Sequence, residues 1–231
     1  MVARIEHEQA EIVDYLAAVY EARGALLAHP SCARLMDRAR DTQLDRVTTQ
    51  AFTRLNLWRA RASDTLRRGD PAERTAWDQA NALLAELVGA GEPIGFAFGA
   101  KLHEALGFPS STARAERLYT ANEEYLKPVY VADEIQRMDL ALAREQEPLA
   151  RAFIALVAMV TIHPFSNGNG RTSRLLADAA LIAEGFLPLS FSFPIASHVG
   201  RTTRGVNRTV TDAIETFFGG LANSYDVVQA P

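Results

Sequence analysis

The stretch that decides the fold of this chain is His163-Pro164-Phe165-Ser166-Asn167-Gly168-Asn169-Gly170-Arg171-Thr172-Ser173-Arg174. It combines a base, a loop bracketed by glycines and two arginines. Gly168 and Gly170 allow a tight turn that brings backbone N–H groups close to a ligand. The run 174–185 that follows is apolar at helical spacing, which places the loop at a helix N-terminus. Unpaired N–H groups and the helix dipole make such a terminus an anion site.

Charged groups flank this predicted anion site on both sides. Arg171 and Arg174 are three residues apart and therefore share one face of the predicted helix. His163 stands just upstream and is the candidate proton acceptor, because an imidazole has an unperturbed pKa of about 6.5. The grouping indicates an active site that handles phosphate. His103 and His198, on apolar stretches elsewhere, are expected to be core histidines bonded to backbone carbonyls.

Composition bounds the class of protein. The chain has 231 residues, of which 48% are apolar and 23% charged, as expected for one globular domain or one domain with an added helical region. The net charge is −4 and the basic residues are scattered, which argues against a general nucleic-acid surface. No run approaches the roughly eighteen apolar residues that a membrane-spanning helix needs.

The single cysteine and the charged start of the chain predict a cytoplasmic location. Cys32 has no second cysteine with which to form an internal disulfide, so a reducing compartment is the simplest setting. Residues 1–10 do not have the pattern of a secretory signal. Secretion by a signal of a non-cleaved kind stays open.

Helical spacing dominates the first half of the chain. One buried stripe on a long helix is predicted from Leu44, Val47, Ala51, Leu55 and Trp58. A break follows at 69–71, where Asp70 caps a new helix, Pro71 takes its first position and Glu73 supports its start. This helix is expected to end near Gly89.

A joint marked by Gly91, Pro93 and Gly95 separates the helices before it from a helix over 100–106. We therefore expect two parts, a helical N-terminal extension over 1–90 and a core domain over 91–231.

The helical pattern fails between 108 and 132, which is the place where strands are expected. The strand candidates are Leu118-Tyr119 and Val129-Tyr130-Val131, and an ordinary surface loop is the alternative. Helices are expected to resume over 133–144 and 148–161, the latter apolar almost all round and therefore buried. Further helices fit 195–207 and 209–225.

The motif as a whole resembles the signature of the Fic family, written His-Pro-Phe-x-Asp/Glu-Gly-Asn-Gly-Arg-x-x-Arg. Every fixed position matches except Asn167, where the family has an acid. The segment 214–218, with its paired phenylalanines, resembles the helix that closes many Fic cores. The likeness covers about residues 95–225. It implies an all-α fold, a Fic-type helical bundle with a small β-hairpin flap before the active-site helix.

The Fic resemblance also implies an activity. Fic proteins transfer a nucleotide monophosphate, usually AMP from ATP, to the Ser, Thr or Tyr hydroxyl of a target protein. By this resemblance the chain is a protein adenylyltransferase that uses ATP or another NTP. The target would dock by strand addition at a flap near 108–132.

The resemblance assigns roles within the motif. His163 would take the proton from the target hydroxyl, while Pro164 and Phe165 would be structural. An anion hole for the inner phosphates, built from backbone N–H groups and an amide donor, would be formed by Gly168, Asn169 and Gly170. Arg171 would meet the inner phosphates and Arg174 the terminal one.

Asn167 departs from the family pattern at the position whose acid normally holds Mg²⁺. An amide offers an oxygen ligand without the charge, so Mg²⁺ binding should be weaker. Three interpretations stay open: a transferase with another nucleotide or a metal held by phosphates and water; a site for a different phosphate-linked donor or for removing AMP; or a degenerate phosphate-binding module. Carboxylates near the flap that would substitute are Glu123, Glu124 and Asp133.

Base recognition and control are less defined. The stretch 200–205 replaces a family segment that lines the base pocket, and its expected tyrosine is absent. Many Fic proteins carry an inhibitory helix, Ser/Thr-x-x-x-Glu-Gly/Asn, whose glutamate pairs with the second motif arginine. The nearest approach here, 211–216, ends in the wrong residue. Either a small partner protein supplies the glutamate, or the protein is not controlled in that way.

Overall fold

The computed structural model of the chain describes residues 2–42, 47–60, 70–108, 112–120, 123–191, 199 and 209–230. Its secondary structure is helical apart from one short hairpin. The elements in chain order are α1 (Val2–Glu21), α2 (Arg23–Leu27), α3 (Pro30–Asp41), α4 (Thr49–Ala60), α6 (Pro71–Gly89), α7 (Phe96–Ala105), β1 (Tyr119–Thr120), β2 (Glu123–Glu124), α8 (Pro128–Arg144), α9 (Pro148–Ile162), α10 (Asn169–Ile182) and α12 (Val210–Gln229).

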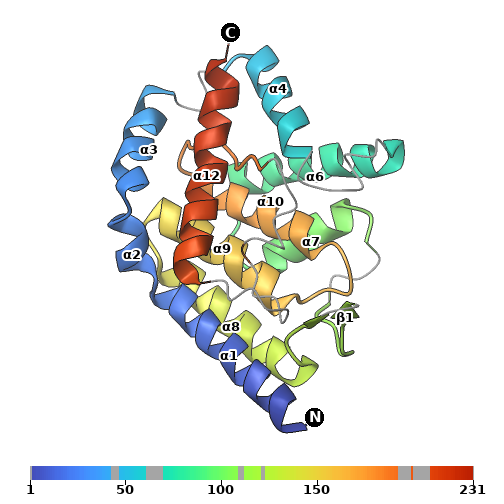
Figure 1. Cartoon of the computed structure of the whole chain (residues 1–231). Coiled ribbons are helices and arrows are strands. Elements are labelled where there is room, and N and C mark those ends of the chain that lie inside the picture. Colours follow the sequence, from blue (N-terminus) through green and yellow to red (C-terminus); the bar gives the residue numbers. More distant parts are fainter. Residues whose placement is uncertain are drawn as a thin grey trace.

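The centre of the bundle is the pair α9 and α10 (Figure 1). Every residue of α9 from Leu149 to Ile162 is buried except the partly exposed Arg151, as its all-round apolar sequence predicted. Helices α1, α2, α8 and α12 pack against α9, while α6 and α7 pack against α10. The loop that joins these two central helices contains the motif, and its residues Ser166 and Asn167 are exposed.

The first ninety residues are not separate from this core. One cluster of buried apolar side chains includes Leu16 of α1 and Leu84 of α6 together with Phe153 of α9 and Leu176 of α10. The division near residue 90 stays a prediction, and the hydrophobic core runs across it.

Helix ends follow the sequence signals at several places. The Asp70 carboxylate accepts hydrogen bonds from the N–H groups of Ala72 and Glu73, Pro71 takes the first position of α6, and the helix ends at Gly89. In α4, the buried residues include Ala51 and Leu55 from the predicted stripe. Of the predicted helix over 195–207 the structure describes residue 199 alone, and His198 lies outside the described residues.

The predicted strand region divides into a hairpin and a helix. β1 and β2 pair antiparallel, with Tyr119 opposite Glu124 and Thr120 opposite Glu123. The strand expected at 129–131 is wrong, because these residues belong to the first turn of α8. Pro128 explains the error: it occupies the first helical position, where its missing N–H costs nothing, so the helix begins five residues before the predicted start.

The structure bears on two further expectations, the state of Cys32 and the length of apolar helices. Cys32 is a free thiol buried in the core, and burial raises its pKa. Of the helices described, none has the length and apolar character needed to cross a bilayer.

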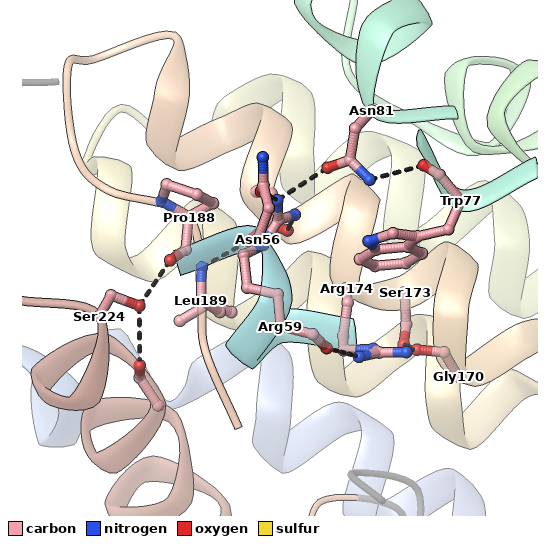
Figure 2. A network of polar contacts seen from close by, with 12 residues as sticks. Asn56, Arg59, Trp77, Asn81, Gly170, Ser173, Arg174, Pro188, Leu189 and Ser224 are labelled. Carbon is pink, nitrogen blue, oxygen red and sulfur yellow. Dashed lines mark hydrogen bonds and ion pairs between the residues drawn. The ribbon is translucent and has the colours of Figure 1, made fainter. Parts of the chain in front are cut away.

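A buried polar network fastens α4 and α6 to α10 (Figure 2). The Arg59 Nη2 of α4 lies 2.5 Å from the Asp178 Oδ2 of α10, and both side chains are almost fully buried. Arg59 Nη1 also donates to Asn56 and to Asn81 of α6, both at 2.7 Å. The second oxygen of Asp178 accepts the Leu189 N–H at 2.6 Å. The two charges are thus paired and hydrogen-bonded, the condition under which buried ions are tolerated.

We predict that Asp178→Asn lowers the free energy of unfolding by about 3–5 kcal/mol, because it leaves the Arg59 guanidinium buried without its counter-charge. Urea denaturation measures the change. The matched control is Asp78→Asn, which breaks an exposed i,i+4 pair with Arg74 and should cost less than about 1 kcal/mol. Equal losses in the two variants would contradict a structural role for the buried pair.

Candidate active site at the α9–α10 junction

The motif forms the connection between α9 and α10, and its two ends have left-handed backbone. His163 follows α9 with φ 52° and ψ 57°, and it is the one non-glycine residue with positive φ in the described part of the chain. Gly168 precedes α10 with φ 78°. A left-handed residue other than glycine costs about 1–2 kcal/mol, and such strain tends to persist at functional sites.

The imidazole of His163 is held as a neutral base. Its Nδ1 lies 3.2 Å from the Val160 carbonyl oxygen, which accepts only if Nδ1 carries the proton, and this leaves Nε2 as the acceptor. The ring of Tyr125 stacks on it, with centroids 3.8 Å apart. Burial, with a further contribution from the nearby Arg114, lowers the pKa of His163 to about 4. The ring is therefore uncharged at neutral pH and can take a proton.

Arg114 fastens the segment before the hairpin to this junction. Its N–H donates to the Pro164 carbonyl and its Nε to the His163 carbonyl, both at 2.7 Å. The guanidinium also reaches the carbonyls of Ile162 and Leu126. These bonds satisfy the free carbonyls at the C-terminal end of α9 with a cation, where the helix dipole favours positive charge.

The loop is closed from within by the Asn169 side chain. Its Oδ1 accepts the Phe165 N–H at 2.9 Å and its Nδ2 donates to the Phe165 carbonyl at 2.7 Å. The amide donor expected of Asn169 is thus engaged inside the loop. What position 169 presents outward is its backbone N–H, which, like that of Gly170, has no helical acceptor four residues earlier.

The rings of Phe165, His103 and Phe108 pack against the loop. Phe165 is fully buried and stacks on His103, with centroids 3.8 Å apart, and His103 Nε2 lies 3.0 Å from the Asn167 carbonyl oxygen. His103 is thus a core histidine facing a backbone carbonyl, as expected. A Cβ at position 168 would fall 2.3 Å from the ring of Phe108, so glycine is required there by space as well as by φ.

Arg171 lies between an aromatic ring and a carboxylate. Its guanidinium carbon is 4.7 Å from the centroid of Phe108, and its Nη1 forms an ion pair with Glu73 of α6. Burial lowers the pKa of Arg171, and the ion pair offsets part of the cost of burying its charge. A phosphate that binds Arg171 must compete with Glu73.

Arg174 is enclosed more completely (Figure 2). Its Nε donates to the Gly170 carbonyl at 3.1 Å and its Nη1 to the Arg59 carbonyl at 2.9 Å, while the ring of Trp77 lies 4.9 Å from its guanidinium carbon. Burial, and then the neighbouring Arg59, lower the pKa of Arg174 to about 9, so it stays charged at neutral pH. In this conformation α4 and α6 cover it.

Metal ligands at the site are sparse. No group of three or more His, Cys, Asp or Glu residues that could hold a metal ion occurs among the residues described. The exposed Asn167 uses its Oδ1 to accept the Gly168 N–H at 2.7 Å. Of the substitute carboxylates expected from the sequence, Asp133 is exposed on α8, and the side chains of Glu123 and Glu124 are outside the described part. A Mg²⁺ ion would need phosphate oxygens and water as ligands as well.

The site thus combines a half-buried, neutral histidine with a glycine loop at a helix N-terminus and two arginines on that helix. The sequence model of the Fic/DOC family matches residues 100–181. This segment of the chain is similar to the Fic/DOC family, and it contains the whole motif.

Curated relatives align over the same part of the chain. The protein adenylyltransferase fic-1 of Caenorhabditis briggsae is 35% identical over 80 residues, which is 33% of this chain and 16% of that protein. The corresponding protein of Caenorhabditis elegans is 34% identical over the same length. The chain thus matches about one-sixth of the length of these relatives.

Solved structures resemble the whole fold. IbpAFic2 in complex with adenylylated Cdc42 matches with a TM-score of 0.60 and 16% identity, over 94% of this chain and 76% of that one. Fic-1 from C. elegans matches with a TM-score of 0.58 and 21% identity, over 98% of this chain and 74% of that one. The all-helical Fic fold predicted from the motif is confirmed.

Arg114 and Glu73 are among the residues of the site that the sequence analysis did not identify. Arg114 stands in a stretch without periodicity, and nothing there signals that it binds the end of α9 some fifty residues later. Glu73 was read only as support for a helix start, yet it is the partner of Arg171. An acid in the first turn of a helix is already explained by the helix dipole, so nothing in the local sequence indicates its ion pair with Arg171.

We predict that the His163 resonances titrate in NMR with a pKa near 4, and that Tyr125→Ala raises this pKa toward 6.5 by letting water reach the ring. The pKa is lower in the folded than in the unfolded chain. Burial of the neutral ring therefore contributes stability that is present above about pH 6.5 and is lost as the pH falls toward 4. The variant His163→Gln assigns the resonances and removes this contribution. An unshifted pKa near 6.5 would contradict the half-buried, stacked position of the ring.

Binding of pyrophosphate tests whether the ion pair between Arg171 and Glu73 weakens anion binding. We predict that Glu73→Gln increases the affinity for pyrophosphate by about tenfold, because Arg171 no longer has to leave a carboxylate, a difference of about 1.4 kcal/mol. Calorimetry compares it with Glu86→Gln, an exposed glutamate on the same helix. Unchanged affinity in Glu73→Gln, with Arg171→Ala also without effect, would show that the anion does not bind at this arginine.

Proposed function

We propose that this chain is a Fic-type protein adenylyltransferase, transferring a nucleotide monophosphate from ATP or another NTP to a Ser, Thr or Tyr hydroxyl of a target protein. The observation that carries the proposal is the neutral His163 with its free Nε2, next to the N-terminus of α10. The names of the aligned relatives support the same activity.

Each residue of the site has a separate role in the proposed transfer. Nε2 of His163 accepts the proton of the target hydroxyl as its oxygen attacks the α-phosphorus and pyrophosphate leaves. The backbone N–H groups of Asn169 and Gly170 and the positive end of α10 stabilise the charge on the phosphates, and the Gly168 N–H joins them once it leaves the Asn167 side-chain oxygen. Arg171 adds a charged fork once Glu73 is displaced. Mg²⁺, when bound, neutralises phosphate charge and orients the chain of phosphates.

Arg174 has a restricted part in this scheme. It contacts a terminal phosphate only if α4 and α6 move away, because Trp77 and the Arg59 carbonyl cover its guanidinium. In the conformation described, it positions the start of α10 through its bond to Gly170.

The arrangement also favours a second candidate. Asn167 lacks the charge that holds a cation, and both motif arginines have partners within the chain. These features suit a Fic relative that uses a different phosphate-linked donor, removes AMP, or only binds phosphate.

The proposal extends to partners and location. A target protein would dock at the β1–β2 hairpin in the region 108–132, as an added strand. We place the protein in the cytoplasm, on the ground of its free Cys32. A small inhibitory partner protein belongs to the proposal as well, although Glu73 already provides a carboxylate for Arg171 within the chain.

A label-transfer scan separates the two candidates. The full chain is incubated with ATP, CTP, GTP and UTP labelled at the α-phosphate, with Mg²⁺ or Mn²⁺ and with lysate proteins. Covalent label on the protein or on a lysate protein supports the transferase. Nucleotide binding without label, under all conditions, supports the second candidate.

We predict that His163→Ala reduces label transfer by about 10²- to 10⁴-fold, the usual cost of losing a general base, and leaves nucleotide affinity nearly unchanged. The reason is that the histidine handles the proton while the loop holds the phosphates. Thermal denaturation checks that the variant folds. Transfer at the wild-type rate would remove His163 from the mechanism.

A further inference from the structure

Under the proposed function, a divalent cation at the loop would need a carboxylate ligand. Mg²⁺ bound with a nucleotide is held in proteins by one or two carboxylates together with phosphate oxygens and water. Position 167 offers an amide oxygen that already accepts the Gly168 N–H. Glu73, the acid nearest to the motif arginines, has its charge engaged by Arg171. Another carboxylate at the loop is therefore needed for metal binding.

Glu116 provides such a carboxylate from a different part of the chain. Its Oε1 accepts a hydrogen bond from the Ser166 Oγ at 2.8 Å, and Ser166 is the residue directly before Asn167. Glu116 and Asn167 are both exposed, so solvent ions can reach them. The Glu116 charge interacts with the guanidinium of Arg114, whose pKa it raises, so a cation bound at the loop would share this carboxylate with Arg114.

The position of Glu116 is fixed relative to the loop. Arg114 bonds through its N–H and Nε to the carbonyls of Pro164 and His163, and its Nη1 donates to the Glu116 carbonyl at 2.8 Å. One arginine thus ties the backbone at 114–116 to the residues that begin the motif. The carboxylate consequently needs little ordering to act as a ligand, which lowers the entropic cost of binding.

We propose that Glu116 supplies the carboxylate that position 167 lacks, and that it would hold a divalent cation beside phosphates bound at the α10 N-terminus, with the Asn167 amide oxygen as a second ligand. This inference rests on the proposed function, because the phosphates complete the coordination. The donor set, one carboxylate and one amide, fits Mg²⁺ or Mn²⁺ and does not fit a soft metal.

The test measures how strongly metal improves nucleotide binding. Calorimetry gives the ATP affinity of the full chain with Mn²⁺, with Mg²⁺ and with EDTA, and the ratio of the affinities with and without metal is the metal gain. Glu116→Gln should reduce the metal gain by about 10- to 100-fold, the range typical for changes around a metal site, and leave the affinity in EDTA unchanged or slightly higher. Glu184→Gln, an exposed glutamate after α10, is the matched control and should change neither.

A rescue variant separates a ligand from a structural residue. Asn167→Asp in the Glu116→Gln background moves the carboxylate to the neighbouring position and should restore the metal gain, with the Mn²⁺ electron paramagnetic resonance signal as a readout independent of activity. An equal metal gain in wild type and Glu116→Gln, or a wild type that binds ATP equally well with and without metal, overturns the role of Glu116 and leaves the proposed function standing. A wild type that binds no nucleotide under any condition overturns both.

Discussion

The ion pair between Arg59 and Asp178 is the constraint on which the arrangement around the site depends. Two unit charges are removed from water at the place where α4, α6 and α10 meet, and desolvation of such ions costs several kcal/mol each. Arg59 also donates hydrogen bonds to the side-chain oxygens of Asn56 and Asn81, and Asp178 accepts one from the Leu189 N–H. Separating the helices would break this ion pair and its hydrogen bonds, and in the structure they lie together over the start of α10.

The state of the two motif arginines follows from that closure. With α4 and α6 held against α10, the Arg59 carbonyl and Trp77 enclose Arg174, and Glu73 reaches Arg171. Both cations of the anion site are thereby neutralised or covered by the chain itself. The opposite side of the junction is different: His163 and the loop are fixed by Arg114 and by the Phe165–His103 stack, neither of which involves α4 or α6. The candidate base and the predicted anion loop are therefore preorganised, while access to the arginines is coupled to the N-terminal helices.

Sequence reasoning succeeded where the signal was local. The cap at Asp70, the apolar α9 and the glycine loop before α10 depend on spacing and on backbone preferences that neighbouring residues set. It failed at 129–131, where β-branched and aromatic residues suggested a strand and Pro128 instead began a helix. Burial of the next turns of α8 against α9 outweighed the weak preference of three residues. The side-chain amide of Asn169 shows a related limit: a motif gives the residue and not the direction in which it points.

The sequence by itself determined the family resemblance, the all-helical class and the candidate base, because a contiguous motif and helical periodicity are written in neighbouring positions. Only the tertiary structure decided which groups surround that motif: Arg114 and Glu116 from the segment before the hairpin, Glu73 and Trp77 from α6, and Arg59 from α4. These residues lie between 49 and 115 positions away from their partners. Pairings over such separations are fixed by how the helices pack around the shared core, and no local pattern in one chain encodes them.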